Sequence, residues 1–226
     1  MLFDLGGTLI DECDFEGNCE IARRFFLDLD PDTMAHAYQE VQTAMDEEAH
    51  GLVGEARLTE FWRRTLARAS GREIDPELAR RFRSALWEVE RPIHLFSDVR
   101  RCLDTLRAQH RALGIVSNSS SEARVRQILD RFGILEYFQR VVSSGTEGIE
   151  KPSREIFRRA IERIRVRPNE ALYVGDLPHT DAKGAGSAGL HSVWLNRYGF
   201  GYGEDPPEIT SLLEVPLWVA RLERRA

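Results

Sequence analysis

Short apolar runs alternate with amphipathic stretches along most of the chain. Five of the runs have the composition of buried strands, and each ends at a turn signal. Between them, apolar residues recur at the spacing of a helix that packs one face against a core. This alternation predicts a parallel sheet with right-handed crossovers. The predicted strands are residues 1–3, 112–117, 140–144, 171–176 and 191–196, and the predicted helices are 98–109, 121–133 and 153–164.

The stretch from residue 14 to residue 92 has a different pattern, because it contains no strand-like run. Its apolar residues follow helical spacing, and glycines and Pro76 separate the helical segments. We therefore predict an α/β protein in which residues 1–13 and 93–226 carry the sheet. Residues 14–92 form an all-helical insertion after the first strand. Helices are expected there at 20–29, 35–49, 58–70 and 75–90.

Composition and charge narrow the possible partners. Of the 226 residues, 42% are apolar and 30% are charged, the balance of an ordinary globular protein. The formal net charge of −6 argues against nucleic acid or an anionic membrane as a partner. No apolar run approaches the roughly 18 residues of a membrane span, and the N-terminus lacks the basic stretch of a secretory signal. Cys13, Cys19 and Cys102 show no paired spacing, which predicts reduced thiols and a cytoplasmic location.

Polar side chains follow four of the predicted strands, at the point where each strand ends. Because the carboxyl ends of parallel strands meet at one edge of a sheet, we expect these side chains to gather in one crevice. Carboxylate oxygens suit Mg²⁺, and a metal, an ammonium group and hydroxyl donors suit a phosphate. A carboxylate aimed at bound phosphorus can serve as a nucleophile. The residues concerned are Asp4, Ser117, Asn118, Lys151, Asp176 and Asp181.

The scarcity of lysine singles out Lys151. The chain has 31 basic residues, and only Lys151 and Lys183 are lysines. A surface cation without a function would almost always be an arginine in this chain. A lysine directly after the third predicted strand therefore favours a functional role.

Four segments stand in the order of a known signature: FDLGGTL (3–9), IVSNSS (115–120), EKPSREIF (150–157) and VGDLPHTDAKGAGSAGL (174–190). They resemble the motifs of the haloacid dehalogenase superfamily: Asp-x-Asp-x-(Thr/Val), a strand-ending Ser/Thr, a later Lys, and Gly-Asp…Asp. The resemblance covers essentially the whole chain and is closest to subfamily I, the phosphoglycolate-phosphatase-like proteins with a helical cap after the first strand. It implies a Rossmann-like core, a cap domain, and hydrolysis of a phosphate ester through an aspartyl-phosphate.

The resemblance also implies a metal site. Asp4 would be the nucleophile, and it would bind Mg²⁺ together with the backbone carbonyl of Gly6 and with Asp176. Asp181 would support the ion, directly or through water. The implied cofactor is Mg²⁺, and the implied partner is a small phosphate ester.

Further roles follow from the same motifs. Ser117 would donate a hydrogen bond to the phosphoryl oxygens, and Lys151 would neutralise charge between the nucleophile and the phosphate. Arginine would be too rigid and too broad in that place. Asn118, Gly7 and Thr8 are expected beside the substrate, where paired glycines permit a close approach of the backbone.

Gly6 departs from the signature. Most phosphatases of the superfamily carry Asp there, which protonates the leaving oxygen and then activates water. Such general acid–base help contributes about 10²–10⁴ in rate, and Gly6 has no side chain to supply it. We expect intact binding of phosphate and Mg²⁺ with weakened proton transfer. Water or another group would relay the proton; Asp11, Glu12 and His179 are nearby in sequence, although a surface or turn role is the simpler interpretation of each.

Three alternatives compete with a phosphatase. A 2-haloacid dehalogenase also lacks the second Asp, but it carries an aromatic residue there and needs no Mg²⁺; Gly6 and the pair Asp176 and Asp181 argue against it. A phosphonate-cleaving relative would need a cap lysine for a Schiff base, and residues 14–92 contain none. A phosphate-binding or partner-binding protein without turnover remains open. No residue pattern selects one substrate or one oligomeric state.

Overall fold

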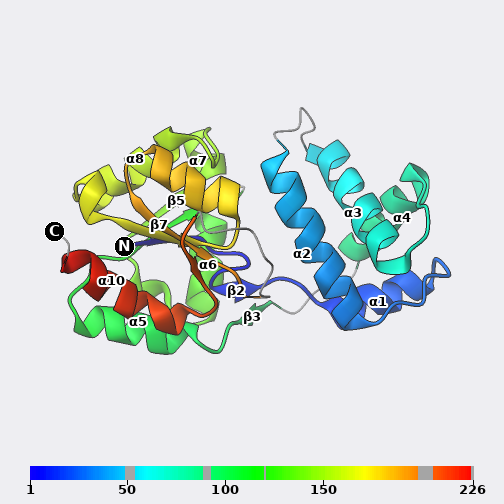
Figure 1. Cartoon of the computed structure of the whole chain (residues 1–226), viewed down its shortest axis with the longest axis horizontal. Helices are drawn as coiled ribbons and strands as arrows, with labels where there is room; N and C mark the ends of the chain where they lie inside the picture. The colour runs from blue at the N-terminus through cyan, green and yellow to red at the C-terminus, as the bar shows by residue number, and fades with distance from the viewer. Residues whose placement is uncertain (49–53, 89–92, 120, 198–205, 225–226) are drawn as a thin grey trace. The chain divides into compact units, whose positions relative to one another are not determined.

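The computed structural model of the chain separates into two compact units, which are described one at a time (Figure 1). Unit 1 consists of Met1–Asp11 and His94–Ala226, and unit 2 consists of Glu12–Ile93. These limits differ by one or two residues from the boundaries placed at 13/14 and 92/93 from the sequence. The structure describes residues 1–48, 54–88, 93–119, 121–197 and 206–224.

Unit 1 is built on a six-stranded sheet in the order β5-β4-β1-β6-β7-β8, in which every neighbouring pair is parallel. This is the predicted Rossmann-like α/β architecture. All five predicted strands are confirmed, and the short edge strand β8 was not predicted. The strands are β1 (Leu2–Phe3), β4 (Gly114–Ser117), β5 (Arg140–Ser143), β6 (Leu172–Gly175), β7 (His191–Leu195) and β8 (Glu208–Ile209).

Helices cover both faces of this sheet (Figure 1). Helix α8 lies on one face, and α5 and α10 lie on the other. The helices are α5 (Val99–Ala108), α6 (Glu122–Arg131), α7 (Ser144–Glu147), α8 (Arg154–Ile164), α9 (Gly184–Ser187) and α10 (Val215–Glu223). Three short 3₁₀ segments and one π-helical segment complete unit 1: η1 (Leu135–Tyr137), η2 (Pro168–Glu170), η4 (Leu212–Glu214) and the π-helical η3 (Pro178–Lys183).

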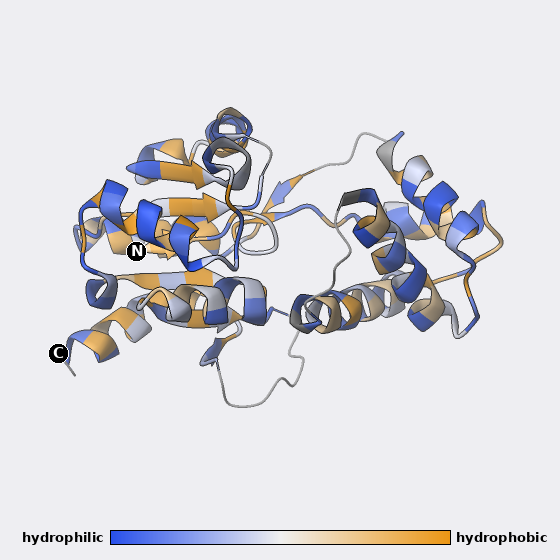
Figure 2. Ribbon diagram, turned by 90° about the horizontal axis from the view of Figure 1, so that it is seen from above, coloured by the Kyte–Doolittle hydropathy of each residue, from blue (hydrophilic) through white to orange (hydrophobic). Residues whose placement is uncertain are grey.

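The core of unit 1 forms because apolar strand residues meet the apolar stripes of the helices. Figure 2 shows the strands in hydrophobic colours. On one face, Phe157 and Ile161 of α8 are buried against Leu2 of β1 and Val116 of β4. Each such side chain contributes about 1.5–3 kcal/mol when fully buried. This packing holds the central strands in register and fixes the edge where the polar residues lie.

A second, two-stranded sheet joins unit 1 to the inserted segment in the sequence. Strand β2 (Ile10–Asp11) pairs antiparallel with β3 (His94–Leu95), with Ile10 opposite Leu95. The pairing brings together the two chain segments that lead into and out of unit 2. It was not predicted, because Ile10–Asp11 and His94–Leu95 each mix one apolar and one polar residue and so form no apolar run.

Unit 2 is helical, and no strand occurs among its described residues. Aspartates begin three of the helices: the carboxylates of Asp14, Asp30 and Asp75 each accept a backbone N–H at 2.9 Å. Trp62 and Phe82 pack edge to face at 5.2 Å in its apolar core. The helices are α1 (Phe15–Arg23), α2 (Pro31–Glu47), α3 (Gly54–Ser70) and α4 (Pro76–Trp87).

The helix predicted over residues 20–29 is placed wrongly. Helix α1 begins at Phe15 because Asp14 caps it, and it ends at Arg23. Phe26 then takes a positive φ of 60°, which no helix allows. The predicted ends of the helices at 35–49 and 75–90 fall partly outside the described residues. None of the helices that the structure describes is long and apolar enough to cross a bilayer.

Candidate active site

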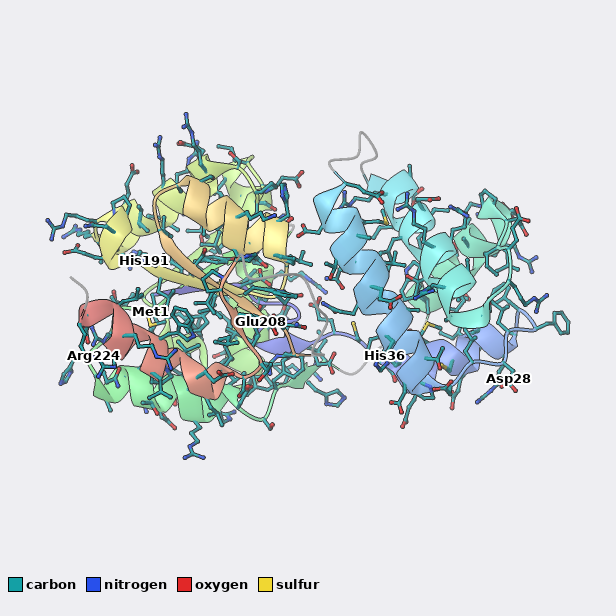
Figure 3. All side chains as sticks on the ribbon, viewed as in Figure 1. Met1, Asp28, His36, His191, Glu208 and Arg224 are labelled. Atoms are coloured by element: carbon teal, nitrogen blue, oxygen red, sulfur yellow. The ribbon has the colours of Figure 1, made fainter. Side chains whose placement is uncertain are left out.

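The carboxyl ends of three adjacent strands carry the predicted acids and hydroxyl. Strand β1 lies between β4 and β6, so Asp4 is flanked by Ser117 of β4 and by Asp176 after β6. All three residues are buried. Met1 and His191, labelled in Figure 3, mark the opposite end of the sheet, where β1 and β7 begin. The predicted gathering of polar side chains at one edge is therefore present.

Lys151 lies at the centre of this group, with only 3% of its side chain exposed. Its Nζ donates to Asp4 Oδ1 at 2.5 Å and to Asp181 Oδ1 at 2.7 Å. The side chain of Asn118 fixes the lysine backbone, since its Oδ1 accepts from Lys151 N at 2.8 Å and its Nδ2 donates to Lys151 O at 3.1 Å. We expected Asn118 beside a substrate; the observed contacts make it a support for the lysine.

Three buried carboxylates converge around the ammonium group. Asp4, Asp176 and Asp181 each offer an oxygen, and these oxygens lie within 4.8 Å of one another. One ammonium balances only one of the three charges when all three acids are ionised. Leaving buried charge uncompensated is costly. An all-oxygen donor set with an excess of negative charge fits a hard divalent cation such as Mg²⁺.

The electrostatics of the cluster reflect this excess. Burial raises the pKa of Asp4 to about 7, against the opposing effect of Lys151 and with a further upward contribution from Asp181. Burial, Asp4 and Asp181 raise the pKa of Asp176 well above its ordinary value. Burial lowers the pKa of Lys151, but Asp181 and Asp4 outweigh it and hold the pKa above its usual range. The lysine is thus charged, and the acids compete for a cation.

Two glycines let the backbone approach the acids. Gly7 has a φ of +70°, and a Cβ there would lie 2.3 Å from Asp176 Oδ2. A Cβ on Gly175 would lie 2.4 Å from Asp181 Cγ. Both distances are too short for a real Cβ, so a side chain at either position would displace the acid beside it. We expected Gly7 beside the substrate; in the structure it lies against a carboxylate of the cluster.

The hydroxyl residues divide into two kinds. Thr8 is fully buried, and its Oγ1 donates to Asp176 Oδ1 at 3.3 Å, so it supports an acid of the cluster. Ser117 ends β4 and is 6% exposed, and its hydroxyl is not one of the fully buried polar atoms that lack a partner. Its place at the end of β4, next to Asp4 on β1, suits a donor to a bound phosphate.

Comparison with known proteins agrees with this geometry. The family model of the haloacid dehalogenase-like hydrolases matches residues 1–195. The chain belongs to the haloacid dehalogenase-like hydrolase family. It is 34% identical over 140 residues to a phosphoserine phosphatase of Thermus thermophilus. That match covers 62% of this chain and 55% of the relative, so the chain spans just over half of the relative's length.

Two of the solved structures that resemble this chain cover nearly all of it. A haloacid dehalogenase-type phosphatase from Thermococcus onnurineus is 25% identical, with 96% of each chain covered and a TM-score of 0.59. A 2-haloacid dehalogenase from Pseudomonas syringae is also 25% identical, with 97% of each chain covered and a TM-score of 0.57. Overall similarity therefore does not distinguish the two reactions, and the residues of the site must do so.

Two residues that contact the cluster were not predicted from the sequence. Tyr173 is fully buried and its hydroxyl accepts from Lys151 Nζ at 3.0 Å, and it lies 2.9 Å from Asp181 Oδ1. Trp194 Nε1 donates to the backbone carbonyl of Asp176 at 2.8 Å. In the sequence, both residues look like apolar core residues of a strand. The one signal that could have identified them is their position in β6 and β7, close to the acids.

The proton-relay candidates lie in different elements. Asp11 is in β2, His179 is in η3, and Glu12 belongs to unit 2. The cluster found among the described residues consists of Asp4, Asp176 and Asp181 and includes none of these three candidates.

Proposed function

We propose that this protein is a Mg²⁺-dependent phosphate monoester hydrolase. It acts on a small phosphorylated metabolite, in the cytoplasm, and works through an aspartyl-phosphate on Asp4. The observation that carries the proposal is the buried ammonium of Lys151 bridging Asp4 and Asp181, with Asp176 beside them. That constellation combines a nucleophile, a fixed cation and a set of oxygen donors. Unit 2 is proposed to be the cap that selects the substrate.

The reaction has two displacements on phosphorus. Asp4 forms a bond to phosphorus as the ester P–O bond breaks, and the leaving alkoxide takes a proton from water. Water then attacks the phosphorus of the aspartyl-phosphate as the bond between phosphorus and the Asp4 oxygen breaks, and its proton neutralises the hydroxide left by the first step. This releases inorganic phosphate and restores the Asp4 carboxylate. Lys151 offsets negative charge in both steps, and the hydroxyl of Ser117 donates to a phosphoryl oxygen. Asn118 and Tyr173 hold the lysine in place.

Asp4, Asp176 and the backbone carbonyl of Gly6 would hold the Mg²⁺ ion, with Asp181 supporting it. When bound, the ion polarises the phosphoryl group and offsets the charge that develops on it. The donor set supports this proposal because the three carboxylates carry more charge than Lys151 balances.

The stabilisation of the protein by Mg²⁺ should depend on pH. The pKa of Asp4 is about 7 in the folded protein, whereas an unfolded Asp titrates near ~3.9. The folded state therefore retains a proton on Asp4 that the unfolded state has released, so Asp4 makes the metal-free protein less stable as the pH rises between these two pKa values. Protons also compete with the metal over this range. We expect the rise in melting temperature caused by Mg²⁺ to be larger at pH 8 than at pH 5.5.

Differential scanning fluorimetry with Mg²⁺ or with EDTA at each pH measures this difference. The Asp4→Asn variant is the control, since it lacks the group with the pKa of about 7, and its response to Mg²⁺ should depend less on pH. An equal Mg²⁺-induced shift at both pH values in the native protein would contradict the proposed ligands.

Gly6→Asp should restore an acid that the native site lacks. Positive φ values among the described glycines include Gly7 but not Gly6, so the backbone accepts a side chain there. We expect turnover of alkyl phosphates, whose leaving groups need protonation, to rise by about 10²-fold. Turnover of an activated aryl phosphate should change far less.

Steady-state kinetics on both substrate classes test this expectation. Gly6→Asn is the matched control, because it adds a side chain of the same size that cannot act as an acid. Equal acceleration of both classes by Gly6→Asp, or the same gain with Gly6→Asn, would show that position 6 is not a missing proton donor.

The proposed function is tested by hydrolysis of an activated aryl phosphate with Mg²⁺ and with EDTA. A good leaving group needs little protonation, so the assay reports on Asp4 and the metal rather than on the absent acid. We expect activity with Mg²⁺ that EDTA removes. Chloride release from 2-haloacids, measured in parallel, would instead identify a dehalogenase. A folded protein without either activity would identify a binding protein.

A further inference from the structure

Arg197 lies outside the catalytic cluster but is tied to the loop that carries Asp4. It follows β7, and its guanidinium stacks on the ring of Phe96 at 3.8 Å from the ring centroid. Its Nη2 donates to the backbone carbonyl of Thr8 at 2.7 Å. That carbonyl belongs to the residue whose hydroxyl binds Asp176.

The arginine is itself held firmly. Nη1 and Nη2 donate to the two carboxylate oxygens of Asp98 at 3.0 and 3.1 Å. This pair is largely buried, with 12% and 10% of the two side chains exposed. Asp98 also accepts from Ser211 Oγ and from Leu212 N, both at 2.9 Å. The Asp98 carboxylate, which has hydrogen-bond partners of its own, therefore fixes one side of the guanidinium, and the second N–H of Nη2 donates to Thr8 O.

We propose that Arg197 is a positioning residue for the metal site, acting through Thr8 on Asp176. The proposal rests on the proposed function, since it concerns the carboxylate that would bind Mg²⁺. Asp98 holds Arg197, Arg197 holds the backbone of Thr8, and the Thr8 hydroxyl orients Asp176. Supports of metal-binding carboxylates typically change metal affinity by 10–100-fold when lost.

The two terminal nitrogens of the Arg197 guanidinium explain why a lysine could not take over its role. Two nitrogens span both oxygens of Asp98, and one of them also reaches Thr8 O. A lysine offers one nitrogen on a flexible stem, so it can keep the charge but not the fixed geometry. The Arg197→Lys variant therefore separates positioning from charge.

The test is a calorimetric titration of Mg²⁺ into the substrate-free protein. We expect Arg197→Lys to weaken Mg²⁺ binding by about 10-fold. Arg159→Lys is the matched control: Arg159 also binds carboxylates, those of Glu147 and Glu155, and one backbone carbonyl, that of Glu147, and these contacts do not reach the cluster. Its Mg²⁺ affinity should stay within twofold of the native value.

A double-mutant cycle then tests whether Arg197 acts on Asp176 through Thr8. In a Thr8→Val background the hydroxyl link to Asp176 is gone, so adding Arg197→Lys should change the Mg²⁺ affinity little further. If the two effects multiply instead, or if Arg197→Lys alone lowers the melting temperature but leaves the affinity unchanged, the proposal is overturned. Should Arg197→Lys not fold, Asp98→Asn tests the same link and should weaken Mg²⁺ binding in the same direction. A native protein that binds no Mg²⁺ would instead overturn the proposed metal site itself.

Discussion

Replacing Asp4 by Asn should abolish Mg²⁺-dependent phosphatase activity while leaving the protein folded. Asn has nearly the same shape as Asp, but its amide cannot displace an alcohol from phosphorus. We expect kcat to fall by about 10⁴-fold or more, as when the nucleophile of a covalent mechanism is removed. The loss should be the same for activated and unactivated esters, because both need the nucleophile.

The fold should tolerate this change because it relieves the charge excess. In the native protein the Asp4 carboxylate is one of the groups that raise the pKa of Asp176. A neutral residue at position 4 removes that repulsion, so the metal-free variant at pH 8 should melt no lower than the native protein. Kinetics, melting curves and circular dichroism measure these effects. The exposed Asp130→Asn is the control and should leave both activity and stability unchanged. Full activity in folded Asp4→Asn would refute the proposed mechanism.

Much of the fold could be predicted from the sequence, because buried strands appear as short apolar runs and packed helices as apolar residues at helical spacing. The runs at 112–117 and 171–176 contain β4 and β6, and the stripe at 153–164 contains α8. Short elements at the edges could not be predicted. Strand β8 is Glu208–Ile209, which is not an apolar run, unlike the equally short β1 (Leu2–Phe3). The pairing of β2 with β3 depends on chain segments that are far apart in sequence.

The acids of the site could be predicted because the carboxyl ends of parallel strands lie at the same edge of the sheet. Residues that directly follow such strands therefore come close together. Asp4 and Asp176 follow adjacent strands, so the sequence indicated their meeting. The supports could not be predicted in the same way. Tyr173 occupies an apolar strand position, and Arg197 is one arginine among many. Their roles come from contacts through space, with Lys151 Nζ and with the Thr8 carbonyl, that no local pattern encodes.

Lys151 is expected to contribute both to the stability of the fold and to the proposed reaction. Three buried acids around one ammonium make the folded state depend on that charge, and the same charge would meet the phosphate. Lys151→Met keeps the length of the side chain and removes its charge. At pH 8 the variant should lose about 3–5 kcal/mol of unfolding free energy, the cost of leaving a buried charge without its partner. Its phosphatase activity should be lost as well.

The loss of stability should shrink as the pH falls. Lys151 is charged at both pH 8 and pH 5, because its pKa lies above its usual range. Asp4 and Asp176 are the groups that titrate: the pKa of Asp4, already about 7 with the lysine present, should rise further without it. At pH 5 Asp4 and Asp176, whose pKa values are raised by burial, take up protons and depend less on a cation, so the native protein and the variant should approach one another in stability.

Urea unfolding at the two pH values measures this convergence. Lys183→Met is the matched control, since Lys183 is the other lysine of the chain and is exposed. This variant should change the unfolding free energy by no more than about 0.5 kcal/mol at either pH. Lys151→Arg keeps the charge, but its broad, rigid guanidinium does not fit between Asp4 and Asp181, so activity should not return. A destabilisation by Lys151→Met that is equal at both pH values would mean that the lysine contributes packing alone, and that the buried acids do not depend on its charge.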